Sequence, residues 1–246
     1  MPRPRFFVDL PLAAGEVVRL PADIAHHAAR VLRLRHGAPI VIFNGSGGEY
    51  AATLLLEGAD ALAKAEDFDA VERESPLALT LVQALVAADK LDWIVEKAVE
   101  LGVARVLVAP MQRSVVHLDD ARAARRLQHW RDVARAACCQ SGRNTVPAVD
   151  YCPSFAAALE SVPADQARLL LLPSAACAIP IAFPGRRAAL VIGPEGGLDD
   201  VEVRQAELSG FIAAQLGPRI LRTETAGIAA LSALQALDGD LAGADR

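Results

Sequence analysis

This 246-residue sequence lacks cysteines in the spacing of a metal-binding or redox motif. Its four cysteines, Cys138, Cys139, Cys152 and Cys177, form no CxxC motif and do not have the spacing of a zinc site. We therefore expect free thiols, buried or partly buried, in a reducing compartment, and no metal. A chain of this length buries roughly 70–75% of its unfolded surface, so it needs neither metal nor disulfide to fold.

Long apolar runs are also missing, although 53% of the residues are hydrophobic. No stretch of about 18 or more apolar residues is free of charges, so the sequence predicts no membrane span. The N-terminal stretch MPRPRFFVDL has charges but no apolar run before a small-residue cleavage site, which excludes a signal peptide. We expect a soluble, cytoplasmic protein that makes no membrane contact.

Lysine is nearly absent, so arginine supplies most of the positive charge of a chain whose net charge is −5. Arginines gather in residues 1–36 and 113–143, whereas residues 49–74 are strongly acidic. Basic patches on an acidic chain are compatible with a phosphate-binding face. The alternative is that arginine replaces lysine throughout the chain and the patches are ordinary solvated surface.

The first 70 or so residues contain short β-branched or aromatic runs at 16–20, 39–44 and 49–56, which predict strands. The glycine cluster at 45–48 predicts a hairpin loop between the last two. Residues 23–34 predict one helix, with Asp23 as its N-cap. These elements are typical of a small β-barrel, and the acidic segment 65–76 that follows is the expected linker.

From Leu77 onward, strands and helices alternate, which is typical of an α/β domain of mainly parallel strands. Asp89 is the expected N-cap of the first helix, and Gly102 is expected to end it. Strands are expected at 77–86, 103–110, 168–173, 188–193 and 211–217, and helices at 90–101, 119–140, 155–159, 199–210 and 223–237.

The strongest local signal is the turn IGPEGGL, residues 192–198, between a buried strand and a helix. Asp199 and Glu202 form a D-x-x-E capping pattern at the start of that helix. Open α/β sheets bind ligands at such turns, where glycines let backbone amides approach a ligand. The turn lacks the GK[ST] ending of a phosphate loop. The alternative is a tight structural turn with a solvated Glu195.

A second turn, LGPRILRTETA at residues 216–226, also follows a strand and opens a helix. Both turns are therefore expected at one edge of the sheet. Arg222 precedes the helix, Thr223 is its expected N-cap, and Glu224 lies in its first turn. The alternative is a capped helix with a surface ion pair of little energetic value.

These motifs occur together with RFFVDL, HHAARVLRLRHG, FNGSGGEY, LDWIVEKAVELGV, RSVV and HWRDVARAACCQSGRNTVP. In this order they resemble the ribosomal RNA small subunit methyltransferase E family, of the SPOUT (trefoil-knot) class, over essentially the whole chain. The resemblance implies a PUA-like RNA-binding β-barrel at 1–72, a linker at 73–78, and a SPOUT α/β methyltransferase domain with a deep trefoil knot at 79–246. The implied activity is S-adenosylmethionine-dependent methylation of N3 of uridine 1498 in 16S rRNA of the small ribosomal subunit. The chain departs from the family pattern at Gln112, Cys139 and Ala87-Ala88.

The resemblance also assigns roles to residues. Arg222 is the first candidate for stabilising the uridine anion, and Glu195 or Glu224 for orienting the base or relaying its proton. The cofactor is expected on Leu172, Pro173, Ile192, Gly193, Pro194, Glu195, Gly196, Leu216, Gly217, Leu221, Arg222 and Thr223. A valine at Gly196 is expected to occupy space that the cofactor needs. The expected RNA contacts are Arg3, Arg5, Arg30, Arg33, Arg35, Arg113 and Arg143.

The helix at 224–237 is apolar on nearly all sides, and the resemblance makes a second copy of the chain its partner, in a homodimer. Within that interface, Leu234 is expected to contact the partner, or else to be an intramolecular core residue. Two other functions stay open from the sequence: a non-catalytic RNA-binding or ribosome-assembly protein of the same fold, and a SPOUT ribose 2′-O-methyltransferase.

Overall fold

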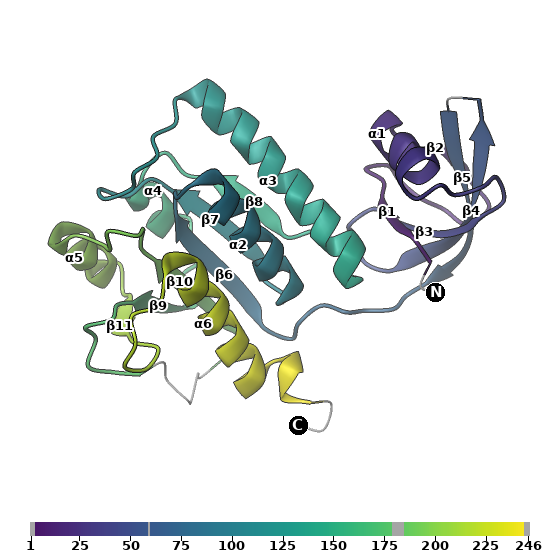
Figure 1. Ribbon diagram of the computed structural model, residues 1–246. Coiled ribbons are helices and arrows are strands. Elements are labelled where there is room, and N and C mark those ends of the chain that lie inside the picture. The colour runs from purple at the N-terminus through teal and green to yellow at the C-terminus, as the bar shows by residue number, and fades with distance from the viewer. Residues whose placement is uncertain (1–2, 59, 179–184, 244–246) are drawn as a thin grey trace. The chain divides into compact units, whose positions relative to one another are not determined.

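The computed structural model describes residues 3–58, 60–178 and 185–243. The chain divides into two compact units (Figure 1), the first formed by residues 1–74 and 135–146 and the second by 75–134 and 147–246. The expected linker, 73–78, includes the point between Glu74 and Ser75 where the chain leaves the first unit. Residues 135–146, which the sequence boundaries assign to the second domain, cluster with the first unit instead.

The first unit is built on a five-stranded sheet in the order β1-β3-β4-β5-β2. Strand β1 pairs with β3 in parallel, and the other pairs are antiparallel. The glycine cluster joins β3 to β4 as a hairpin, as predicted, and Gly45, Gly47 and Gly48 there all have positive φ. The strands are β1 (Arg5–Phe7), β2 (Val17–Arg19), β3 (Pro39–Phe43), β4 (Glu49–Glu57) and β5 (Asp60–Asp69).

Two expectations for this unit were wrong. Residues 65–69 belong to β5 rather than to a linker, because they pair with β4, where Ala65 lies opposite Ala52 and Phe68 opposite Tyr50. The predicted helix is shorter and divides into α1 (Ala22–His26) and a π-helical turn η1 (His27–Val31). Pro21, not Asp23, occupies its N-cap, and Arg33 with φ +52° lies beyond its end.

The second unit contains a six-stranded, all-parallel sheet in the order β11-β9-β10-β6-β7-β8. The central strands β6 and β10 are buried along almost their whole length, which explains their continuous apolar sequences. Strand β8, like β1 in the first unit, was not predicted. The strands are β6 (Ala78–Ala84), β7 (Arg105–Ala109), β8 (Ala148–Tyr151), β9 (Ala167–Leu171), β10 (Arg187–Ile192) and β11 (Ile212–Ala214).

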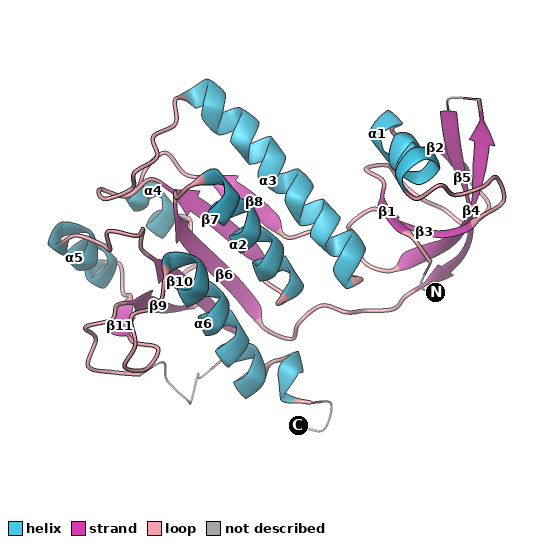
Figure 2. Ribbon diagram, in the orientation of Figure 1, coloured by secondary structure: helices cyan, strands magenta, loops and turns pink. Residues whose placement is uncertain are grey.

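Helices cover both faces of this sheet (Figure 2). They are α2 (Ala88–Glu100), α3 (Asp120–Ser141), α4 (Phe155–Glu160), α5 (Asp200–Leu208) and α6 (Thr223–Asp238), and the short η2 (Asp240–Ala242) follows α6. Helices α2 and α6 pack against each other, as do α4 and α5. Successive residues of β6 face opposite sides of the sheet. Leu81 lies against Gly227 of α6 on one side, and Val82 belongs on the other side to the hydrophobic cluster that contains α4 and α5 residues.

The capping predictions were partly right. Asp199 and Glu202 form a complete capping box on α5, and Gly102, with φ +75°, follows the C-terminal end of α2. Asp89 and Thr223, by contrast, lie inside their helices, because Ala87 and Arg222 are the N-cap residues. Thr223 instead uses its hydroxyl for a contact in the site described below.

Helix α6 contributes Leu231 and Leu234 to the core of its own unit, where both are almost fully buried. Leu234 is therefore an intramolecular core residue, and a charge there would test folding rather than association. The implied trefoil knot depends on the complete path between β9 and β10. Residues 179–184 of that path lie outside the described residues, so the knot stays a prediction.

Two expected absences concern membranes and metals. No helix in the described part of the chain is both long and apolar enough to cross a membrane. Within the same residues, no three His, Cys, Asp or Glu side chains are grouped so that they could hold a metal ion.

All four cysteines are free thiols. Cys138 and Cys152 are buried and Cys139 is half-buried, as expected, but Cys177 is exposed. Burial raises the pKa of the Cys138 thiol to about 12, so this thiol stays protonated at neutral pH.

Candidate active site

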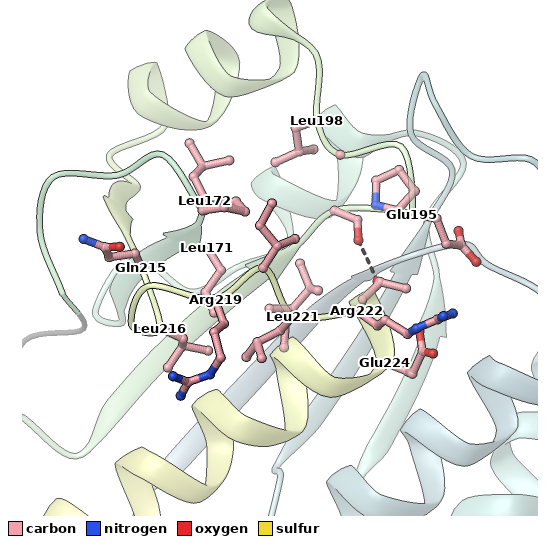
Figure 3. A pocket seen from close by; sticks show the side chains of 18 of the residues that line it. Leu171, Leu172, Glu195, Leu198, Gln215, Leu216, Arg219, Leu221, Arg222 and Glu224 are labelled. Atoms are coloured by element: carbon pink, nitrogen blue, oxygen red, sulfur yellow. Dashed lines mark hydrogen bonds between the residues drawn. The ribbon is translucent and has the colours of Figure 1, made fainter.

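One cavity of about 370 Å³ lies at the carboxyl ends of β9, β10 and β11 (Figure 3). The turn after β10 and the turn after β11 both line it, as their positions after parallel strands predict. Leu171, Leu172 and Pro173 at the end of β9, the strand between these two, complete the wall. Eleven of the twelve residues expected to bind the cofactor line this cavity; Gly196 does not.

The glycines of the two turns have different surroundings. A Cβ on Gly217, which has φ +73°, would meet nothing within 4 Å, so its side faces open space. A Cβ on Gly196 would instead lie 3.0 Å from Cβ of Arg113, and Arg113 Nη1 donates a hydrogen bond to the Gly196 carbonyl oxygen at 2.9 Å. A valine at Gly196 would therefore press on Arg113 rather than fill the cavity directly, which corrects the reason expected from the sequence.

A buried hydrogen-bonded chain ties the two turns together. Thr223 Oγ1 donates to the Gly193 carbonyl oxygen at 2.7 Å and accepts a hydrogen bond from Gln83 Nε2 at 3.0 Å. Both Gln83 and Thr223 are buried. The sequence reasoning missed Gln83, although a single amide in the otherwise apolar strand 77–86 was an available signal.

We expect Thr223→Val to loosen the cavity. Valine has nearly the same volume but cannot make either hydrogen bond, and it leaves the Gly193 carbonyl without this donor. The expected cost is about 1–3 kcal/mol in the free energy of unfolding, together with weaker cofactor binding. Denaturant unfolding and calorimetry measure the two effects, with Thr223→Ser as the variant that keeps the hydroxyl. Equal cofactor affinity in both variants would contradict the link between the Thr223 hydroxyl and cofactor binding.

Four charged side chains lie at the mouth of the cavity. Lys90 Nζ donates to Glu195 Oε1 at 2.9 Å and lies 3.9 Å from Glu224 Oε2. Arg222 and Glu224 lie at one end of the cavity in Figure 3, whereas Gln215, Leu216 and Arg219 lie at the other. Arg222 is exposed, and Glu224 is half-buried. The sequence reasoning identified Glu195, Arg222 and Glu224 but not Lys90, Arg219 or Gln215.

The ion pair changes the proton affinity of both of its members. The hydrogen bond to Glu195 raises the pKa of the Lys90 ammonium. Partial burial acts to raise the pKa of the Glu195 carboxyl, but the hydrogen bond and charge of Lys90 outweigh burial and hold this pKa below its usual value. Both groups are therefore ionised at neutral pH.

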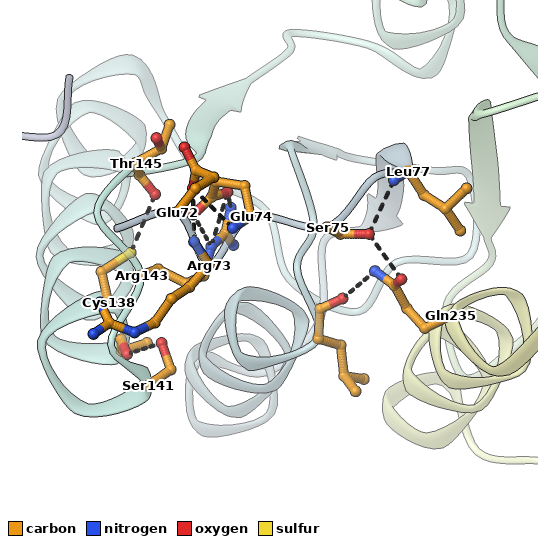
Figure 4. A network of polar contacts seen from close by, with 12 residues as sticks. Glu72, Arg73, Glu74, Ser75, Leu77, Cys138, Ser141, Arg143, Thr145 and Gln235 are labelled. Atoms are coloured by element: carbon orange, nitrogen blue, oxygen red, sulfur yellow. Dashed lines mark hydrogen bonds and ion pairs between the residues drawn. The ribbon is translucent and has the colours of Figure 1, made fainter. Parts of the chain in front are cut away.

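The seven arginines expected to contact RNA fall into two groups. Arg3, Arg30, Arg33, Arg35 and Arg113 are exposed. Arg5 and Arg143 are instead held in a polar network of the first unit (Figure 4 shows the Arg143 part). Arg143 Nε donates to Glu74 Oε1 at 3.0 Å, and Arg5 Nη2 donates to Asn144 Oδ1 at 2.6 Å. These two guanidinium groups serve the fold of the unit, so we leave both out of the RNA face proposed below.

The structure places the three departures from the family pattern at different positions in the fold. The Gln112 backbone N–H donates to Glu202 Oε1 at 2.7 Å, and Ala87 is the N-cap residue of α2. Cys139 is half-buried at the C-terminal end of α3.

The residues of the cavity fit S-adenosylmethionine. The volume of the cavity lies in the range of roughly 300–1,000 Å³ typical of small-molecule sites. Leu172, Leu216 and Leu221 offer apolar walls for an adenine ring, and the open side of Gly217 leaves backbone groups accessible. The carboxylates of Glu195 and Glu224 give the mouth the negative groups that suit a sulfonium cation.

Family models match both parts of the chain. A model described as an RNA methyltransferase domain matches residues 73–235, and one described as an RNA methyltransferase PUA domain matches residues 20–63.

Full-length relatives agree with the two models. Ribosomal RNA small subunit methyltransferase E of Bacillus subtilis is 32% identical over 94% of this chain and 95% of its own length. The structure of the enzyme of the same name from Neisseria gonorrhoeae, bound to S-adenosyl methionine, is 39% identical with a TM-score of 0.89, covering 97% of this chain and 99% of that one. A Legionella pneumophila methyltransferase in complex with the same cofactor is 32% identical with a TM-score of 0.92, covering 98% and 100%. This chain therefore belongs to the ribosomal RNA small subunit methyltransferase E family of RNA methyltransferases.

Proposed function

We propose that this protein transfers a methyl group from S-adenosylmethionine to N3 of uridine 1498 in 16S rRNA of the small ribosomal subunit, in the cytoplasm. The observation that carries the proposal is the cavity at the ends of β9, β10 and β11, which fits the cofactor and has the exposed Arg222 at its mouth. The names of the relatives support the class of substrate, and the cofactor bound in two similar structures supports the methyl donor.

Bound S-adenosylmethionine supplies an electrophilic methyl group. The residues that would hold it are the apolar and backbone groups of the turns at 193–198 and 216–222, with Leu172 and Pro173 from the end of β9. The Thr223 hydroxyl keeps these turns at a fixed separation through its bond to the Gly193 carbonyl. Such preorganisation lowers the entropic cost of bringing donor and acceptor together.

Uracil N3 carries a proton at neutral pH, and it becomes a strong nucleophile only when this proton leaves. Arg222 can donate N–H bonds to the uracil carbonyl oxygens and stabilise the negative charge that develops there. Glu224 is the carboxylate we assign as proton acceptor, because its Oε2 is buried and accepts no hydrogen bond from the described residues. Lys90 Nζ lies 3.9 Å from this oxygen but donates its hydrogen bond to Glu195.

We place the RNA face of the first unit on its exposed arginines, Arg3, Arg30, Arg33 and Arg35. In the second unit, the exposed Arg113 is a separate candidate RNA contact. Replacing Arg30, Arg33 and Arg35 together by glutamine is expected to weaken RNA binding and to reduce its dependence on salt. The slope of log affinity against log salt should fall by about one for each lost phosphate contact. Cofactor affinity should stay unchanged, and an unchanged salt slope would identify these arginines as ordinary solvated surface.

We infer in addition that the protein is a homodimer. Ile228 and Leu237 on α6 are only half-buried in this chain, so apolar surface is left for a second copy. Sedimentation velocity measures the association state, and a monomer at all concentrations would contradict the inference.

Methyl transfer in vitro tests the proposed function. The purified protein is incubated with methyl-labelled S-adenosylmethionine and 16S rRNA, either free or assembled in small subunits, from cells that lack the gene. Nucleoside digestion and mass spectrometry are expected to show 3-methyluridine. Methylation of the ribose 2′-hydroxyl, or no incorporation into either substrate, would contradict the proposal.

A further inference from the structure

The four charges at the cavity mouth come from three separate segments. Lys90 lies in the first turn of α2, Glu195 in the turn after β10, and Arg222 and Glu224 at the start of α6. Two positive and two negative groups balance, so the choice of pairs decides which cation stays available to a ligand. The binding properties of the site therefore depend on which charges pair, as well as on its net charge.

The pairing in the structure is one-sided. Lys90 Nζ is hydrogen-bonded to Glu195 Oε1 at 2.9 Å and is 3.9 Å from Glu224 Oε2. The Arg222 guanidinium, by contrast, makes no hydrogen bond or ion pair with any described residue, although Glu224 is only two positions away in the sequence. Glu195 is thus hydrogen-bonded to the lysine and Glu224 lies close to it, whereas no carboxylate among the described residues compensates the charge of Arg222.

We propose that Lys90 is a positioning residue for Arg222: by holding Glu195 and Glu224, it leaves the Arg222 guanidinium free to bind the deprotonated imide of a pyrimidine base. The inference rests on the proposed function, because it takes Arg222 as the group that contacts the methyl acceptor. Without Lys90 the mouth holds one positive and two negative charges. A carboxylate can then pair with Arg222 and compensate its positive charge, so that Arg222 stabilises the developing uracil anion less and the N3 proton is harder to remove.

The first test needs neither RNA nor cofactor. Phenylglyoxal modifies deprotonated guanidinium groups, so pairing with a carboxylate slows the reaction. In Lys90→Met, we expect modification of Arg222, followed by peptide mass spectrometry, to be about tenfold slower than in the unaltered protein, as a shift of one pKa unit would give. Lys90→Arg keeps the positive charge and should keep the rate. The matched control is Lys97→Met on the same helix, where Lys97 pairs with Glu96 and Glu100 outside the cavity.

The second test is the pH profile of methyl transfer. If loss of the N3 proton is opposed in Lys90→Met, kcat at neutral pH should fall about tenfold and recover as the pH is raised by about one unit. A merely structural role of Lys90 would lower kcat at every pH. Circular dichroism confirms that the variant is folded, and calorimetry separates a loss of cofactor binding from a change in kcat.

The outcomes distinguish this inference from the proposed function. Slower modification of Arg222 together with the displaced pH profile supports the inference. An unchanged rate of Arg222 modification in folded Lys90→Met overturns it, whatever the activity, and so does a pH-independent loss of kcat. A protein that fails to methylate uridine at all overturns the proposed function and, with it, the role that Lys90 has for this reaction, even if Arg222 modification slows.

Discussion

Replacing Arg222 by glutamine is expected to lower the kcat of methyl transfer about 100- to 1,000-fold, the size of effect seen when one donor to a developing negative charge is removed. Glutamine can still donate a hydrogen bond, but it carries no charge to stabilise the uracil anion. Because Arg222 is exposed and makes no ion pair with the described residues, its loss should leave folding nearly unchanged. Lysine at this position is expected to restore only part of the rate, since it lacks the planar pair of donors.

Single-turnover assays with small subunits measure this effect, and calorimetry gives the cofactor affinity of the same variants. The matched control is Arg204→Gln, because Arg204 is exposed on α5 and does not line the cavity. A loss confined to cofactor affinity, with kcat unchanged, would contradict the role assigned to Arg222.

Arg143→Met is expected to destabilise the first unit by about 3–5 kcal/mol, because it leaves the Glu74 carboxylate without its buried cation. The Arg143 side chain is only 4% exposed and that of Glu74 22% exposed, so water cannot replace the lost partner fully. Denaturant unfolding followed by a probe in the first unit measures the change in the free energy of unfolding.

An exposed ion pair provides the control for Arg143. Arg122 and Asp119 are 3.4 Å apart, with side chains 65% and 61% exposed, so Arg122→Met should cost less than about 1 kcal/mol. Equal effects of the two substitutions would show that the buried network contributes no more than a surface pair. RNA binding by the folded fraction of Arg143→Met should be close to that of the unaltered protein, since Arg143 is not part of the proposed RNA face.

Much of the second unit could be predicted because its signals are local. The buried strands β6 and β10 read as continuous apolar runs, and the capping box at Asp199 and Glu202 marks the start of α5. The two glycine turns follow parallel strands, and the carboxyl ends of parallel strands meet at one edge. These facts place the cavity without knowledge of long-range contacts.

The missed elements depend on contacts between distant residues. Strand β1 has three residues and becomes a strand only by pairing with β3, and β8 similarly depends on β7. The acidic end of β5 resembles a linker because its last four residues are all exposed, and it is a strand only through pairing with β4.

The site residues that the sequence did not predict were missed for the same reason. Lys90 and Gln83 belong to the site only because α2 and β6 bring them to Glu195 and Thr223, which lie 105 and 140 positions away. Arg5 and Arg143 resemble RNA contacts by charge alone, and their partners Glu49 and Glu74 become visible only in the folded chain.

The most direct measurement of the central claim is mass-spectrometric mapping of 16S rRNA from cells that lack this gene and carry either the unaltered gene or its Arg222→Gln variant. We predict that N3 of uridine 1498 is unmodified without the gene, methylated with the unaltered gene, and methylated slowly or incompletely with the variant. Full N3 methylation in cells without the gene would contradict this prediction, as would a methyl group that the unaltered gene places on another atom.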